Sequence, residues 1–395
     1  MSMDDADIIA PDPNVENEED LDPAVSKSVT EAVVTGTDWT TETILNQLNR
    51  GNIELNPRFQ RRDAWDPVRK SRFIESLFLG LPIPQLVLAE RPGQRGSYLV
   101  LDGKQRLLTL RQFASVPGSD FSPLELRRLE VRSELNGKTL QDIEADGKLA
   151  ADLTAFQNQT IRTVVVRNWS NQDFLYLVFL RLNTGSVPLS PQELRQALLP
   201  GPFTDFLDDF TSGSSLLQKA LRVNGPDKRM RDVEVLLRFY AFDMRLKSYK
   251  GNLKPFLDET ARHLNRSWST AEETVRARAA ICERAIETTF EVFGERSSFV
   301  RWNGSNYESQ FNRAIFDIMT YYFKHDDIAE AARQHKPELV SAYQRLCTRD
   351  QEFLRSIQTT TKSISAIRSR LQKWRQVLVR TLDLSVPQPS LPRAA

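Results

Sequence analysis

The sequence predicts an α+β domain followed by an all-helical domain. Up to about residue 170, short runs of β-branched and aliphatic residues alternate with helical patterns, whereas beyond it apolar residues recur at helical spacing. We place the α+β domain at residues 37–170 and the helical domain at residues 171–384. A leader, residues 1–36, and a tail, residues 385–395, are predicted to be disordered because they lack the apolar residues of a core.

The leader concentrates negative charge. Residues 1–26 contain nine Asp and Glu and no Lys or Arg, so the remaining chain carries +10 although the 395 residues together have a formal net charge of +1. Two interpretations are open for this acidic segment. It is either a solubilising tail, or an autoinhibitory segment that occupies a basic surface of its own chain through charge complementarity.

Composition excludes several classes of protein. No stretch approaches the roughly 18–20 apolar residues that span a bilayer. The acidic start resembles neither a secretory signal nor a transit peptide. Two cysteines and three histidines lack the spacing of a structural zinc site. We therefore predict a cytoplasmic protein without a membrane partner.

The α+β domain begins with two short helices. Thr40 and Thr41 offer N-caps to a helix that stops near Gly51, and Asp66 with Pro67 starts a second one that runs to Gly80. Three strands are predicted around the next helix. The segments Leu86–Ala89 and Ser97–Leu101 form a hairpin, Leu107–Phe113 is helical, and Ile161–Val166 is a further strand.

The helical domain is predicted from periodicity and caps. Phe174–Leu182 is apolar, and Ser190 with Pro191 and Glu193 forms a capping box. Further helices are predicted at Val233–Leu246, Ala271–Phe293, Glu308–Phe323 and Glu352–Leu382. In the last helix, Ile and Leu residues seven apart form a stripe that suits a bundle neighbour or a partner helix, including a second copy in a homo-oligomer.

The strand–turn–helix at Asp102–Arg106 is the most informative segment. A glycine at a strand end allows a tight turn, and the following helix start attracts anions. Lys104 and Arg106 are suited to phosphate oxygens, and Asp102 either ligates Mg²⁺ or positions the arginines. The alternative is a plain turn with solvated cations. The segment is not a Walker A loop, because Gln105 stands where Ser or Thr is required.

A second cluster precedes this turn, at residues 56–65. Arg58, Arg61 and Arg62 are interleaved with Phe59 and Trp65. Charge for phosphates and rings for bases are typical of a nucleotide or nucleic-acid surface. In the alternative interpretation the rings are core residues and the arginines lie on the surface.

These motifs resemble a known family. In order, they are Asn56-Pro57-Arg58-Phe59-Gln60-Arg61, Trp65, Ile74-Glu75-Ser76, Gly80-Leu81-Pro82-Ile83-Pro84 and Asp102-Gly103-Lys104-Gln105-Arg106-Leu107. The set is similar to the N-terminal domain of GmrSD-type restriction endonucleases, in the ParB/sulfiredoxin-like superfamily. Later blocks extend the resemblance to about residues 38–325: Leu182 to Arg195, Arg231 to Phe239, and Phe293 to Asp317.

The resemblance implies a ParB/sulfiredoxin-like fold and an NTP pocket that uses Mg²⁺, in proteins that defend bacteria against foreign or modified DNA. Carried over by motif, Asp102, Gln105 and Arg106 would be catalytic, with Asp102 as the metal ligand. The residues expected to contact the nucleotide are Gln60, Arg61, Gly103, Lys104, Asn183 and Glu193. The family signature reads Asp-Gly-Gln-Gln-Arg, so Lys104 departs from it; a cation there favours phosphate binding over the positioning of a water.

Two other departures narrow the function. Relatives carry a C-terminal HNH nuclease domain, and the three histidines of this sequence lack that arrangement. The sulfiredoxin branch has a cysteine in its loop, whereas Cys282 and Cys347 lie in the helical domain. We therefore expect a sensor or regulatory subunit that works with a separately encoded nuclease or ATPase effector.

A basic C-terminal region suggests a second function. Residues 351–395 hold eight Lys and Arg against two acidic residues. The residues predicted to contact DNA are Arg58, Arg62, Arg368, Arg370 and Lys373. The alternatives to nucleotide chemistry are accordingly a DNA-binding module or a helical adaptor for an effector. For the C-terminal charges themselves, an amphipathic helix with a solvated face is the other open interpretation.

Overall fold

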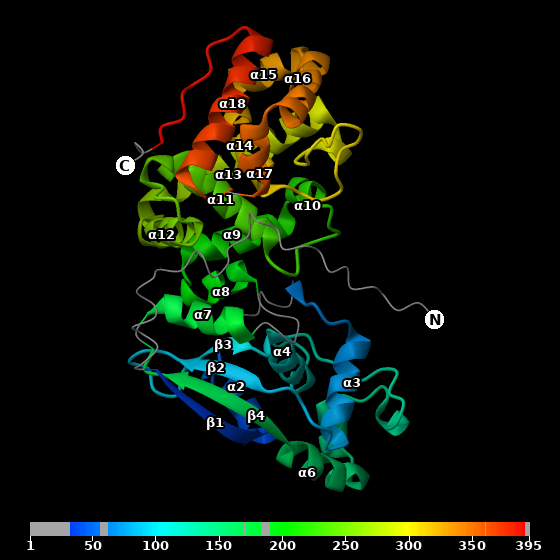
Figure 1. Cartoon of the computed structure of the whole chain (residues 1–395). Helices are drawn as coiled ribbons and strands as arrows, with labels where there is room; N and C mark the ends of the chain where they lie inside the picture. The colour runs from blue at the N-terminus through cyan, green and yellow to red at the C-terminus, as the bar shows by residue number, and fades with distance from the viewer. Residues whose placement is uncertain (1–31, 56–61, 170, 183–189, 360, 392–395) are drawn as a thin grey trace. The chain divides into compact units, whose positions relative to one another are not determined.

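The computed structural model describes residues 32–391 except 56–61, 170, 183–189 and 360 (Figure 1). The described residues fall into two compact units that divide between Leu198 and Leu199. The N-terminal unit mixes strands and helices, and the C-terminal unit is helical, which confirms the predicted fold class.

The N-terminal unit is built on a four-stranded sheet. In chain order its main elements are β1 (Val33–Thr40), α2 (Thr41–Asn49), α3 (Pro67–Phe78), β2 (Leu86–Glu90), β3 (Tyr98–Asp102), α4 (Lys104–Phe113), α5 (Leu140–Ala145), α6 (Ala150–Asn158), β4 (Thr160–Arg167), α7 (Gln172–Leu182) and α8 (Pro191–Leu198). The strand order is β1-β4-β2-β3. Strand β4 runs antiparallel to β1 and parallel to β2, and β2 with β3 forms the predicted hairpin.

Local capping accounts for the helix starts. The Thr40 side chain accepts a hydrogen bond from the Thr43 amide at 3.1 Å, and the Asp66 carboxylate accepts one from Arg69 at 2.9 Å. Each bond satisfies an N–H group that has no partner inside its helix. Pro67 occupies the first turn of α3, where a missing N–H costs nothing. The predicted starts of both helices are confirmed.

The sheet has a hydrophobic core on each face. Alternate residues of a strand point to opposite faces, so Leu86 and Leu88 join one core while Val87 and Ala89 join the other. Helices α2, α3, α4 and α6 supply the first core. Helices α7 and α8 supply the second, which contains Leu194. The division therefore falls after α8, later than the predicted boundary at residue 170, because these two helices cover the sheet.

The leader prediction needs a correction at its end. Residues 33–36, predicted as part of a disordered leader over residues 1–36, belong to β1 and pair with β4 in the register Val33 with Arg167. The segment has the β-branched residues of a strand and an existing edge to pair with. Residues 1–31 lie outside the described residues.

The C-terminal unit is an array of helices. Its α-helices are α9 (Pro202–Gly213), α10 (Ser215–Leu221), α11 (Arg231–Arg245), α12 (Leu253–Arg266), α13 (Trp268–Phe293), α14 (Arg313–Phe323), α15 (Asp326–Gln334), α16 (Lys336–Arg349), α17 (Gln351–Gln358) and α18 (Ile364–Leu382). Helix α14 begins later than predicted because Asn312 caps the amides of Ala314 and Ile315. No helix in the part of the chain that the structure describes is long and apolar enough to cross a membrane.

The predicted helix Glu352–Leu382 is wrong as a single element. It is divided into α17 and α18, and Ser363 caps α18 by accepting from the Ala366 amide at 3.1 Å. The apolar stripe of α18 is core: Leu371, Trp374 and Leu378 are each at most 2% exposed. The stripe thus packs inside this unit. A homo-oligomer that pairs through the stripe stays a prediction, which the burial of these side chains does not support.

The start of the predicted disordered tail is also packed. Within residues 385–391, the Val386 side chain is 1% exposed. Its carbonyl oxygen accepts a hydrogen bond from Arg375 Nε at 2.8 Å. This part of the tail is therefore attached to α18, and residues 392–395 lie outside the described residues.

Candidate functional site

The candidate site is the turn between β3 and α4. Gly103 is the N-cap of α4 and has a φ of 94°, in the region that favours glycine. A Cβ at this position would collide with the buried Leu86 side chain. Helix α4 starts at Lys104, so Lys104, Gln105 and Arg106, predicted as a loop, form its first turn. No side chain caps this helix start, which leaves its N-terminal end facing the turn uncapped.

Asp102 and Arg106 bracket the turn. One Asp102 oxygen accepts from the Gly103 amide at 2.7 Å, and the other accepts from the Arg106 guanidinium at 3.2 Å. Arg106 also donates to the Gln85 carbonyl oxygen at 2.9 Å. Burial lowers the pKa of Arg106, and the neighbouring Asp102 opposes that change.

Some hydrogen-bonding capacity is left at this turn. The Asp102 side chain is 22% exposed, whereas that of Arg106 is 8% exposed. The Nε of Arg106 is buried and has no hydrogen-bond partner among the described residues. A buried donor without a partner is costly, and an anionic ligand would satisfy it.

Gln105 points to a different segment. Its Oε1 accepts a hydrogen bond from the Ala64 amide at 3.3 Å, which links α4 to the residues that precede α3. The amide oxygen is therefore engaged with the backbone. The structure gives Gln105 a visible positioning contact, and its catalytic role stays a prediction.

Lys104 points to α8. Its Nζ lies 2.8 Å from Glu193 Oε1, and the two side chains are 5% and 6% exposed. The other Glu193 oxygen accepts from the Ser190 amide at 2.7 Å, and Ser190 Oγ accepts from the Glu193 amide at 3.0 Å. The predicted capping box is thus confirmed. The structure brings together two residues that were predicted separately as nucleotide contacts, and it pairs them with each other.

Sequence reasoning missed a polar cluster beside α4. Lys70 of α3 is 6% exposed, donates to Gln112 of α4 at 2.7 Å and forms an ion pair with Asp63. The available signal was its spacing: Lys70 lies four residues before Ile74, on the apolar face of α3. This cluster holds Asp63, next to Ala64, against the same helix that carries the candidate site.

Several predicted residues cannot be placed. Gln60, Arg61, Arg58 and Asn183 lie outside the described residues. Among the residues that are described, Asp102, Gly103, Lys104, Gln105, Arg106 and Glu193 gather around the start of α4.

The turn fits a metal only as part of a complex. Within the described ranges, no three His, Cys, Asp or Glu side chains come together as a metal cluster. Mg²⁺ that arrives with a nucleotide takes most of its ligands from phosphates and water and needs one or two protein carboxylates. Asp102, which is partly exposed at the turn, suits that role.

Two of the predicted DNA contacts are wrong. Arg62 is 0% exposed and Arg370 is 1% exposed, so neither reaches a phosphate backbone. Arg370 lies three residues after Ile367 and four before Trp374, on the apolar face of α18, and that spacing was the missed signal. Arg368 and Lys373 are partly exposed, and their DNA contacts stay predictions.

Arg370 belongs to a buried network in the helical unit. Arg238 of α11 donates through Nε to Asp317 of α14 at 3.0 Å, and Arg370 of α18 lies 3.3 Å from the same carboxylate. Arg370 also donates to the carbonyl oxygens of Ser356 and Thr361. Burial lowers the pKa of Arg370 to about 10, and Asp317 opposes that change.

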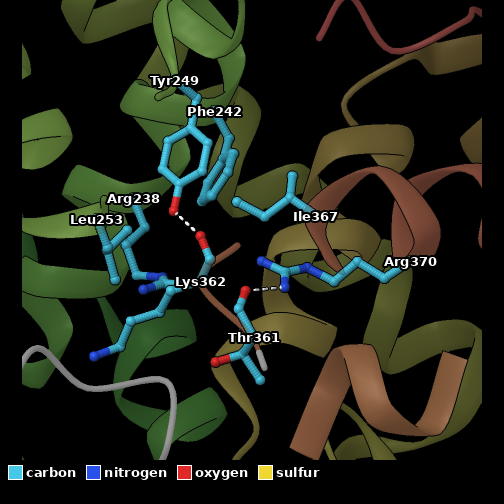
Figure 2. A pocket seen from close by; sticks show the side chains of 8 residues that line it. All are labelled: Arg238, Phe242, Tyr249, Leu253, Thr361, Lys362, Ile367 and Arg370. Carbon is cyan, nitrogen blue, oxygen red and sulfur yellow. Dashed lines mark hydrogen bonds between the residues drawn. The ribbon is translucent and has the colours of Figure 1, made fainter. Parts of the chain in front are cut away.

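A small pocket lies beside this network. Figure 2 shows Arg238 and Arg370 on either side of Thr361 and Lys362, whose carbonyl oxygens accept from Arg370 and Tyr249. The space between these side chains does not admit a water molecule. The pocket is a packing feature of the α17–α18 connection.

Comparison with known proteins draws attention to the β3–α4 turn. The family model of the GmrSD restriction endonuclease N-terminal domain matches residues 41–200. This range contains the β3–α4 turn and both helices that cover the second face of the sheet. No curated protein matches the chain.

Proposed function

Since residues 41–200 of this chain are a GmrSD restriction endonuclease N-terminal domain, we propose that the chain is a nucleotide-binding regulatory component of a restriction system. In this proposal the β3–α4 turn binds the phosphates of an NTP. A separately encoded nuclease or ATPase responds to the bound nucleotide, and foreign or modified DNA is the signal.

The observation that carries the proposal is the turn at Gly103. Its positive φ turns the chain into a ten-residue helix whose start no side chain caps. Uncapped helix starts bind phosphate through backbone N–H groups and the helix dipole. The strand–glycine–helix arrangement therefore supplies the backbone donors that a phosphate needs.

The neighbouring side chains have complementary roles in this proposal. Arg106 directs its unpartnered Nε to a phosphate oxygen while its Nη2 stays bound to both Asp102 and Gln85. Asp102 would hold Mg²⁺ brought by the nucleotide, and the ion would neutralise phosphate charge. Gln105 keeps the preceding segment in place through Ala64. We expect binding with slow turnover, because none of these contacts leaves a group dedicated to orienting a water.

The test is binding of NTPs to the full chain. We expect one NTP with Mg²⁺ to raise the melting temperature and to give a measurable Kd by calorimetry. Arg106→Gln and Asp102→Asn should each weaken binding about 10- to 100-fold, because each removes a charge-assisted contact. Arg127→Gln is the control, since this arginine of the same unit is 59% exposed.

The proposal fails if no NTP at millimolar concentration shifts the melting temperature. It also fails if Arg106→Gln and Arg127→Gln bind equally well. Turnover is measured separately by phosphate release, so binding without hydrolysis still supports a regulatory role.

A further inference from the structure

Lys104, the first residue of α4, has a buried partner in α8. Its ammonium forms an ion pair with Glu193 at 2.8 Å. The two residues are 89 positions apart in the sequence and lie in the first turns of α4 and α8. The pair therefore joins two helix starts within the N-terminal unit.

Glu193 is held from both sides. Oε1 receives the Lys104 ammonium, and Oε2 receives the Ser190 amide that opens α8. A carboxylate with both oxygens engaged has one orientation, and it fixes its partner in turn. Any shift of α8 against α4 would break the ion pair or the capping box.

Because the Lys104–Glu193 ion pair is buried, breaking it destabilises both charges. With about 5% of each side chain exposed, neither charge is compensated by solvent when the other is missing. Releasing the ammonium to a phosphate would leave the Glu193 carboxylate buried and without its cation. Moving the Lys104 ammonium from Glu193 to a phosphate therefore has a large free-energy cost. The buried Nε of Arg106 differs, because it has no described partner to lose.

We propose that Lys104 is a positioning residue: its ion pair with Glu193 fixes α8 against the start of α4, and it does not contact the nucleotide. This inference rests on the proposed function for its effect on nucleotide binding. The coupling of the two helices can be measured without any nucleotide. In this chain the phosphate charge is met by Arg106 and the helix start.

Two conservative substitutions test the pair. Lys104→Gln removes the ammonium and keeps a side chain that can hydrogen-bond, and Glu193→Gln keeps the capping box because Gln serves at that position as well as Glu. Lys104→Gln alone takes the Lys104 ammonium away from the buried Glu193 carboxylate and should lower the melting temperature by about 5–10 °C. In the double variant, two amides replace the two charges and can hydrogen-bond, so at least half of that loss should be recovered. Lys148→Gln, at an exposed site, is the control.

Nucleotide affinity then separates positioning from direct contact. We expect Lys104→Gln to weaken binding and the double variant to bind within about 3-fold of the wild type. If Lys104 contacted phosphate, the double variant would stay weak, and Glu193→Gln alone would bind more tightly because it frees the ammonium. Either result would overturn the inference.

The remaining outcomes are also decisive. If the fall in melting temperature of the double variant equals the sum of the falls in the two single variants, the two residues are not coupled. This result would overturn the inference, whatever the nucleotide affinities are. Loss of turnover in Glu193→Gln with unchanged affinity would make Glu193 a catalytic residue instead. Failure of the wild type to bind any NTP would refute the proposed function, while the melting cycle would still report on the coupling.

Discussion

The β3–α4 turn of the N-terminal unit and the Arg238–Asp317–Arg370 network of the helical unit use the same residue types to different ends. The turn joins one buried guanidinium group to a carboxylate, and the network joins two. At the turn, Asp102 is 22% exposed and the helix start has no side-chain cap. In the network, Asp317 is 4% exposed and lies between two arginines that are each 2% exposed.

The surroundings explain this difference. Arg370 donates to backbone carbonyls of the α17–α18 connection, so its charge is used to hold three helices and a loop together. Beside it, Arg313 and Glu234 form a second buried pair with two contacts of 2.9 Å. A network whose members bind one another stabilises a core, whereas a turn with an uncapped helix start can accept a ligand.

The largest effect should come from removing the shared carboxylate of the network. Asp317→Asn keeps the shape of the side chain and removes the carboxylate that the buried Arg238 and Arg370 share. We expect the free energy of unfolding to fall by about 3–5 kcal/mol, measured by urea denaturation. Nucleotide affinity of the folded protein should not change.

The control is Asp327→Asn, because this residue is exposed on α15 and should change stability by about 0.5 kcal/mol or less. A loss below about 1 kcal/mol in Asp317→Asn would contradict a structural role for the network. The arginines of the network would then be candidates for binding an anion, like the β3–α4 turn.

A smaller effect is expected at the turn itself. Gly103→Ala and Gly118→Ala both place a side chain at positive φ, 94° and 86°, which costs about 1 kcal/mol. A Cβ added at Gly118 meets no other atom, but the new methyl group at Gly103 collides with Leu86. We expect a total loss of about 2–4 kcal/mol at Gly103 and about 1 kcal/mol at Gly118.

The pair of glycine variants also separates stability from binding. Because Gly103 sets the direction of the helix start, its variant should bind nucleotide about 10-fold more weakly at a temperature where both proteins are folded. Equal stability and equal affinity in the two variants would show that the turn has no special geometry.

Local signals were enough for much of the fold and for the position of the site. Thr40, Asp66 and Ser190 were recognisable as caps because each bonds to an amide within three residues. The strand–glycine–helix order likewise follows from a short window of sequence. These features depend on neighbours along the chain, which a sequence displays directly.

The rest depends on partners far away in the sequence. The ion pair of Lys104 could not be predicted, because nothing near Lys104 in the sequence indicates Glu193, 89 residues later. Arg370 was taken for a DNA contact because its partner Asp317 lies 53 residues earlier, in another helix. The position of Arg370 on the apolar face of its helix was the one local indication that it is buried. That position identifies neither its ion-pair partner nor its role.

The smallest effect is expected at Lys373 of α18. This residue was predicted to contact DNA, and in the structure it forms an ion pair. It lies 2.8 Å from Asp350, and the two side chains are 28% and 24% exposed. Although burial opposes it, hydrogen bonds from Lys373 and the Phe353 amide hold the pKa of Asp350 below its ordinary value of 3.8. A lowered carboxyl pKa stabilises the fold above pH 3.8, and this contribution is lost as pH falls through the folded-state pKa.

Asp350→Asn isolates that contribution, because Asn still caps α17 where Asp350 now accepts from the Phe353 amide at 2.9 Å. We expect the variant to be about 0.5–1 kcal/mol less stable than the wild type at pH 6, with the difference shrinking toward pH 3. Lys373→Met should show at least this loss and a pH dependence of the same sign, since it removes the other half of the pair and also the 3.2 Å contact with Glu352. If Lys373→Met instead keeps full stability but weakens salt-dependent DNA binding, the partly exposed face of α18 that carries Lys373 is a nucleic-acid surface. The structural role would then belong to the buried face with Arg370.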